Sequence, residues 1–415
     1  MHTSILTIVL MAALISTTAA MPRGDNPTPP VHVPLRRNPN YKRGTWEQII
    51  AWKSLLKNYD IVQKTVHLSY DMEHHFEYYA QVWVGTPRQA LRLGFDTAGS
   101  DIWFGTRNCT ANACVNTTLN RQLFNQTASS SFKPNGAPWQ ISYDGPWKTA
   151  SEKFHLNASG IVGSDIITIG ALSVQQDVGL ADNMTDGWTD RGIDGRFGLG
   201  WGSEAVGLGG SSFVQNLMNT GGASNETKYF ISVLLPSDRR MFGTDGSILF
   251  GESDSSRYTG DLHTIPVSGN HGAFRIDNIK FNNETINYST LAVFRSSHHF
   301  LGVQDVIADQ FHSHIQGAVK DPSVGGWLIP CDYSKNNTSM DDRLALQLNG
   351  KDFFIPYRDL VLEDEPRSEV DKTKLCISGV QGGFNAWSVG AVFMKNHYLV
   401  FEYGNNPSVH IAPVK

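Results

Sequence analysis

The sequence LRLGFDTAGS at residues 91–100 decides the fold, because it combines an apolar strand with a sharp turn that begins at Asp96. About 100 residues later the apolar, glycine-rich element DGRFGLG follows at 194–200. The second half repeats this order, with LAVFRSS at 291–297 and, some 90 residues further on, WSVG at 387–390. This internal repeat predicts two similar β lobes that face each other across a cleft.

Composition supports this interpretation. A chain of 415 residues is long enough for two or three domains. With 39 Gly, 21 Phe and 10 Trp and only 18% charged residues, it is unlike disordered, collagen-like or coiled-coil chains and favours a mostly β protein. A net charge of −5 argues against a nucleic-acid partner. Strand patterns occur at 78–84, 91–95, 166–169, 248–250 and 398–403, and the chief helical pattern beyond residue 66 is at 303–315.

The N-terminus predicts export. An apolar run at 5–15, followed by small residues up to Ala20, is typical of a signal peptide over residues 1–20. That run is too short to span a bilayer, and the C-terminus shows no anchor or retention signal. We therefore expect a secreted extracellular protein, or one in the lumen of an acidic secretory compartment, without a membrane anchor. Ten N-x-Ser/Thr sequons predict a glycoprotein: Asn108, Asn116, Asn125, Asn157, Asn183, Asn225, Asn283, Asn287, Asn336 and Asn337.

Residues 21–66 differ from the rest in composition. They carry eight basic and three acidic side chains, whereas the remainder of the chain has a net charge of −10. Residues 46–56 have apolar residues at helical spacing. A basic segment ahead of an acidic body favours a propeptide that lies over the groove of its own domain, with a disordered tail as the alternative.

At these motifs the chain resembles the pepsin and cathepsin D family of aspartic peptidases. Residues 96–98 with the downstream Trp103 resemble the D-T-G signature, and 141–143 resemble the start of the flap. Residues 246–251 resemble the crossover between lobes, and 31–37 the start of the propeptide. The resemblance implies a bilobal, mostly β fold around a central cleft, with an N-terminal lobe over 67–250 and a C-terminal lobe over 251–415.

The family's chemistry needs two carboxylates, one from each lobe, that share a proton and hold a water between them. One oxygen takes a proton from the water while the protonated partner polarises the peptide carbonyl. The resemblance places Asp96 at the first position but Arg295 at the second, followed by Ser296 and Ser297 instead of Thr and Gly. We expect Asp96 and Arg295 to form an ion pair, and the loss of one cooperating acid to cost on the order of 10⁴-fold or more in rate.

We therefore predict a pseudo-peptidase in which Asp96 is vestigial and the cleft is kept for a peptide or protein ligand, bound through strand-like hydrogen bonds. One alternative is an active acid endopeptidase in which another acid stands in for the missing one. Another is a structural or surface-interaction glycoprotein whose cleft is blocked by its own propeptide. We expect a monomer.

The remaining candidate residues have structural interpretations. Trp103 and Tyr143 are expected to pack together beside the cleft, which Thr97 and Ser296 also line. The resemblance implies two disulfides, Cys109–Cys114 and Cys331–Cys376, with metal ligation as the remote alternative. His298 and His299 are candidate metal ligands together with Asp96, but adjacent residues on a turn usually point apart. No metal or other cofactor is expected.

Overall fold

The computed structural model describes residues 31–35, 78–115, 121–143, 156–170, 172–189, 192–202, 207–220, 228–235, 246–269, 271–281, 284–321, 326–333, 343–362 and 375–415. The predicted signal peptide, the predicted helix at 46–56 and most of the predicted propeptide lie outside these residues.

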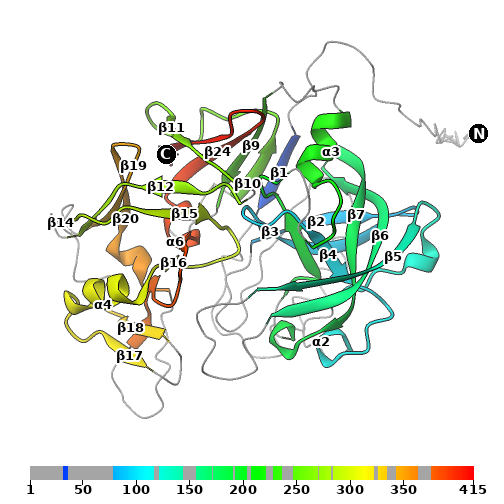
Figure 1. Cartoon of the computed structure of the whole chain (residues 1–415), viewed down its shortest axis with the longest axis horizontal. Coiled ribbons are helices and arrows are strands. Elements are labelled where there is room, and N and C mark those ends of the chain that lie inside the picture. The colour runs from blue at the N-terminus through cyan, green and yellow to red at the C-terminus, as the bar shows by residue number, and fades with distance from the viewer. Residues whose placement is uncertain are drawn as a thin grey trace, which may run out of the picture.

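The first lobe is built on a seven-stranded sheet in the order β2-β3-β8-β4-β7-β6-β5 (right side of Figure 1). Two of its strands, β6 and β7, are 13 residues each and pair along their whole length as a hairpin. The strands are β2 (Tyr79–Val84), β3 (Gln89–Asp96), β4 (Ile102–Gly105), β5 (Lys133–Ser142), β6 (Asn157–Ile169), β7 (Leu172–Met184) and β8 (Gly195–Gly198). Helices α2 (Asn112–Val115) and α3 (Phe213–Thr220) accompany this sheet.

The second lobe contains three smaller sheets (left side of Figure 1). The five-stranded sheet has β12 (Phe274–Ile276), β15 (Thr290–Phe294), β23 (Trp387–Val389), β16 (Leu301–Gly302) and β22 (Val380–Gln381). The four-stranded sheet has β14 (Glu284–Ile286), β13 (Asn278–Phe281), β19 (Arg343–Leu348) and β20 (Lys351–Pro356), and the three-stranded sheet has β17 (Val319–Asp321), β18 (Gly326–Pro330) and β21 (Leu375–Ile377). Helices α4 (Asp305–Ser313) and α6 (Ala391–Met394) complete the lobe.

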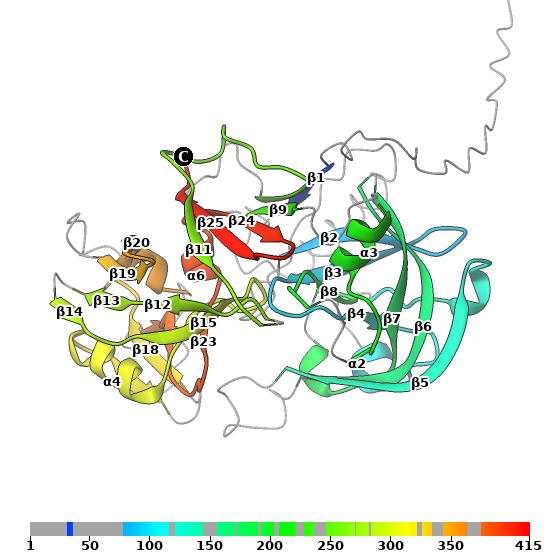
Figure 2. The ribbon, with the colours of Figure 1, turned by 45° about the horizontal axis from the view of Figure 1, so that its top comes forward.

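A six-stranded sheet joins the lobes, with strands from both halves of the chain (Figures 1 and 2). Its order is β1 (Val31–Leu35), β10 (Gly246–Phe250), β9 (Tyr229–Leu234), β24 (His397–Tyr403), β25 (Ser408–Pro413) and β11 (His263–Pro266). The edge strand β1, from the predicted propeptide, pairs antiparallel with β10. Each chain half therefore contributes to a common sheet that fixes the position of the other.

The two lobes repeat one local arrangement. In the first lobe β3 runs parallel to β8, with Phe95 opposite Phe197. In the second lobe β15 runs parallel to β23, with Phe294 opposite Val389. The prediction of a mostly β fold with two similar lobes is confirmed, since the repeat found in the sequence corresponds to paired strands in each lobe.

Candidate functional site

The turns that follow β3 and β15 meet at the junction of the lobes through reciprocal hydrogen bonds. The Thr97 hydroxyl donates to the Phe294 carbonyl (2.7 Å), and the Ser296 hydroxyl donates to the Phe95 carbonyl (2.7 Å). Each hydroxyl also accepts from the other turn's backbone N–H, at 3.2 Å from Thr97 and 3.1 Å from Ser296. Both side chains are buried. Thr97 and Ser296 thus play the same part in the two lobes.

This equivalence fixes the positions of Asp96 and Arg295, which immediately precede Thr97 and Ser296 in the chain. A second contact gives the same register. The Gly198 N–H donates to the Asp101 carbonyl (3.0 Å), five residues after Asp96, and the Gly390 N–H donates to the Phe300 carbonyl (3.2 Å), five residues after Arg295. Arg295 therefore occupies, in the second lobe, the position that Asp96 has in the first.

Asp96 is held by its own turn. Its side chain is buried, and Oδ1 accepts a hydrogen bond from the Ala98 N–H (2.9 Å). The other oxygen faces Gly99, because a Cβ added at Gly99 would lie 3.2 Å from Oδ2. A serine at position 99 would therefore bring a hydroxyl near this carboxylate, where glycine provides none.

Arg295 does not form the expected ion pair. Within the described part of the chain, no ion pair or hydrogen bond joins its guanidinium to Asp96. The Asp96 Oδ1 instead accepts a hydrogen bond within its own turn, from the Ala98 N–H. Arg295 is partly buried, and its Nε is a buried donor without a hydrogen-bond partner. The Ser297 hydroxyl, two residues along, is also buried and unpartnered.

An aromatic cluster lies beside Asp96 in the first lobe. The Trp103 indole N–H donates to the Tyr143 hydroxyl (2.8 Å), and the two ring centroids are 6.4 Å apart. Trp188 packs edge-on against both rings, at 5.0 Å from Trp103 and 5.7 Å from Tyr143. Burial raises the pKa of Tyr143, so this phenol stays protonated. Trp103, Tyr143 and Trp188 therefore pack together on this side of the site.

Arg196, on β8, was not among the residues singled out from the sequence. It is only 2% exposed, and its guanidinium carbon lies 5.7 Å from the Tyr143 ring centroid and 5.6 Å from that of Trp188. Such placement over aromatic faces favours a cation. The signal was present in the sequence, because Arg196 interrupts an otherwise apolar, glycine-rich stretch at 195–200.

Asp101 is a second acid of the same turn that sequence reasoning passed over. Its Oδ1 accepts a hydrogen bond from the Gly207 N–H (2.9 Å). Burial raises its pKa, although backbone hydrogen bonds from Gly207 and Leu208 oppose the effect. No described hydrogen bond joins Asp101 to Asp96, but the negative charge of Asp96 also helps to raise the Asp101 pKa.

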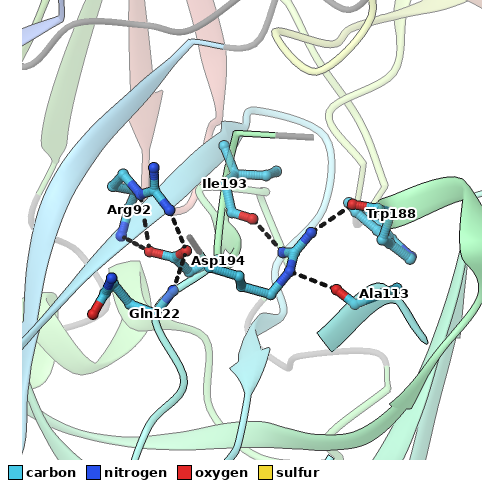
Figure 3. A network of polar contacts seen from close by, with 7 residues as sticks. Arg92, Ala113, Gln122, Trp188, Ile193 and Asp194 are labelled. Carbon is cyan, nitrogen blue, oxygen red and sulfur yellow. Dashed lines mark hydrogen bonds and ion pairs between the residues drawn. The ribbon is translucent and has the colours of Figure 1, made fainter. Parts of the chain in front are cut away.

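A polar network braces the first lobe behind these residues (Figure 3). The buried Asp194 pairs with Arg92, with Nη2 and Oδ1 2.8 Å apart, and accepts from the Gln122 N–H (2.8 Å). Arg121 donates to three backbone carbonyls, those of Ala113 (2.9 Å), Trp188 (2.5 Å) and Ile193. The guanidinium of Arg121 therefore ties the Trp188 segment to α2 and to the start of β8.

The structure also gives the positions of the predicted disulfides and of the candidate metal ligands. Both disulfides are present, Cys109–Cys114 and Cys331–Cys376. No cluster of three or more potential metal ligands occurs among the residues with a described position. His298 Nδ1 lies 2.7 Å from the Ser388 hydroxyl.

Five of the ten sequon asparagines are described. Four of them are exposed, Asn108, Asn157, Asn183 and Asn287, and Asn125 is partly buried. The other five lie outside the described residues: Asn116, Asn225, Asn283, Asn336 and Asn337.

A pocket of about 300 Å³ lies away from the two turns. Its walls come from α3, from the segment after β8 and from the β24–β25 turn, and include Trp201, Gln215, Met218 and Tyr403. Neither Asp96 nor Arg295 lines it. No helix in the described ranges is long and apolar enough to cross a bilayer.

Comparison with known proteins covers nearly the whole chain. A family model described as eukaryotic aspartyl protease matches residues 77–414. Syncephapepsin of Syncephalastrum racemosum is 31% identical over 355 residues, which cover 83% of this chain and 79% of that protein. Rhizopuspepsin-1 of Rhizopus niveus is 29% identical over 426 residues and covers 99% of both chains. Gastricsin of Callithrix jacchus is 24% identical over 389 residues, or 91% of this chain and 93% of its own.

Proposed function

Because this chain belongs to the eukaryotic aspartyl protease family, we propose that it is a pepsin-like protein that has lost peptide hydrolysis and uses its cleft to bind peptides. The observation that carries this proposal is the position of Arg295. The reciprocal Thr97 and Ser296 hydrogen bonds support the assignment of Arg295 to the position where the family's chemistry requires the second acid.

A guanidinium cannot replace that acid. It stays protonated throughout the pH range of proteins, so it neither accepts a proton from water nor shares one with Asp96. It also has no acidic proton to offer to a peptide carbonyl and return in the next step. Asp96 alone can accept a proton from water as a base. No second acid is then present to donate a proton to the peptide carbonyl.

The runner-up function, an active acid endopeptidase, rests on Asp101. This carboxyl is buried, has a raised pKa and belongs to the same turn as Asp96. Its Oδ1 is, however, engaged by the Gly207 N–H within the first lobe, whereas the missing acid belongs to the second lobe. Asp101 is therefore the residue to substitute if the wild-type protein cleaves peptides.

The decisive experiment is cleavage of denatured haemoglobin and a mixed peptide library between pH 3 and pH 6. Wild type is compared with Arg295→Asp, and with Ala98→Gly/Gly99→Ser/Arg295→Asp, which adds a hydroxyl near Asp96 Oδ2. Each protein is assayed with and without a statine-type inhibitor, and Asp96→Ala in the triple-variant background is the matched control. We expect a silent wild type and inhibitor-sensitive cleavage by at least the triple variant, abolished by Asp96→Ala.

Inhibitable cleavage by the wild type that disappears in Asp96→Ala would refute the loss of hydrolysis. In that case Asp101→Asn tests the runner-up, because the amide cannot supply a proton as a carboxylic acid does.

We propose in addition that the protein is exported and glycosylated. The apolar run at 5–15 and the ten sequons support this proposal, as does the exposure of four of the five described sequon asparagines. Exposure is required because a glycan is bulky and hydrophilic and has to project into solvent.

A further inference from the structure

The turn after β15 carries two buried donors that the fold does not use. The Nε of Arg295 and the hydroxyl of Ser297 are both buried, and neither has a hydrogen-bond partner in the described structure. Buried polar groups in native proteins are nearly always paired, and an unpaired charged donor is especially unfavourable. Two such groups two residues apart point to an acceptor that is not among the described residues.

Nearby acids do not supply that acceptor. Asp96 accepts from its own turn and forms no ion pair with Arg295. Asp305 and Asp309, on the helix that follows the turn, both pair with Lys320 at 3.2 Å. None of these three carboxylates therefore forms a described ion pair with Arg295.

We propose that the turn of Arg295 and Ser297 binds the carboxylate of a peptide lying in the cleft. This inference rests on the proposed function and names its ligand class: peptides with an acidic side chain or with a free C-terminal carboxylate at this point. A guanidinium presents parallel N–H donors that match the two oxygens of a carboxylate, and the serine hydroxyl provides a further donor.

The charged groups around Tyr143 include a second arginine. Arg196 is a second buried cation on the first-lobe side, held over the rings of Tyr143 and Trp188. The charges of Arg196 and Asp96 both act on the Tyr143 hydroxyl, so Arg196 and Asp96 lie in the same part of the site. Asp101 acts on the same hydroxyl, so Arg196 and Arg295 share this region with the carboxylates of Asp96 and Asp101.

The test uses the full chain as secreted from a eukaryotic host and four fluorescent octapeptides of alternating Ala and Phe. One has a central Glu and an amidated C-terminus, one a central Gln and an amidated C-terminus, one a central Gln and a free C-terminus, and one both carboxylates. Binding is measured by fluorescence anisotropy at pH 6, where a Glu side chain with its ordinary pKa of about 4.3 is ionised.

We expect at least one carboxylate peptide to bind about tenfold to 100-fold more tightly than the amidated Gln peptide, as for hydrogen bonds to charged groups. Arg295→Gln should remove this preference, and Arg295→Lys should keep part of it because the charge remains. The matched control is Arg275→Gln, since Arg275 is an exposed arginine on the neighbouring strand β12. Thermal unfolding of each variant checks that it is folded.

Tighter binding of the amidated Glu peptide would identify an acidic side chain as the ligand. Tighter binding of the Gln peptide with a free C-terminus would identify the C-terminal carboxylate. Equal binding of all four peptides, unchanged in Arg295→Gln, would overturn the carboxylate site and leave peptide binding in place. Binding of none of them would overturn both the site and peptide binding, while the loss of hydrolysis stands or falls on the separate cleavage assay.

Discussion

Two buried histidines of the second lobe predict that acid destabilises this protein. His312, on α4, stacks on Trp327 with ring centroids 4.2 Å apart, and its Nε2 lies 2.8 Å from the Ser378 hydroxyl. His397, on β24, stacks on Phe393 at 4.2 Å. Burial lowers the pKa of both imidazoles from 6.5 to about 4, although backbone hydrogen bonds partly oppose this.

The sign and size of the effect follow from these values. Because the folded chain favours the neutral imidazole, the stabilisation is complete above pH 6.5 and is lost as the pH falls towards 4. A pKa difference of about 2.5 corresponds to about 3 kcal/mol for each histidine. Each histidine should therefore contribute at most about 1.4 kcal/mol per pH unit to the slope of the free energy of unfolding against pH in this interval.

Urea unfolding of wild type, His312→Gln, His397→Gln and the double variant at several pH values between 4 and 7 measures these slopes. Glutamine cannot titrate, so each single variant should have a shallower slope than wild type, whatever its absolute stability. The matched control is His314→Gln, because His314 lies two residues from His312 and is exposed. A double variant with the full wild-type slope would refute the reasoning.

Two further predictions concern the junction of the lobes and the surface. Ser296→Ala removes the partner of the buried Phe95 carbonyl and Thr97 N–H, so it should lower the free energy of unfolding by about 2–4 kcal/mol in urea titrations. Ser130→Ala is the control, since its hydroxyl is exposed, and a loss below about 0.5 kcal/mol is expected there. Removal of N-glycans by an endoglycosidase should lower the mass of the secreted protein, and an unchanged mass would contradict glycosylation. Peptide mapping should find glycan at the exposed sequons. Those sequons are at Asn108, Asn157, Asn183 and Asn287.

The fold was predictable because its signals are local and repeated. Strand β3 ends at Asp96, where the sequence changes from alternating apolar residues to small turn residues, and β15 ends one residue before Arg295 in the same way. The helical pattern at 303–315 became α4 over Asp305–Ser313, slightly shorter at both ends. Periodicity identifies an element reliably and its ends less so, because capping contacts decide the last turn.

The site was predictable only in part. Sequence spacing leads to Asp96 and Arg295, but the expected ion pair depends on where each side chain points, which spacing does not encode. The carboxylate of Asp96 finds a donor two residues away in its own turn, at Ala98. The role of Arg196 was likewise hidden, because its aromatic neighbours Tyr143 and Trp188 come from segments far apart in the sequence.

The junction of the lobes separates what the fold requires from what catalysis requires. The hydroxyls of Thr97 and Ser296 satisfy buried backbone groups of the opposite lobe, so the loss of either one leaves unpaired polar atoms in the core. The side chain at position 295 makes no such contact, and its Nε has no hydrogen-bond partner in the described structure. The described contacts between the lobes at this junction therefore do not depend on the side chain of Arg295. The lobe junction is thus built by Thr97 and Ser296, which leaves the side chain of Arg295 available for the ligand role proposed for it.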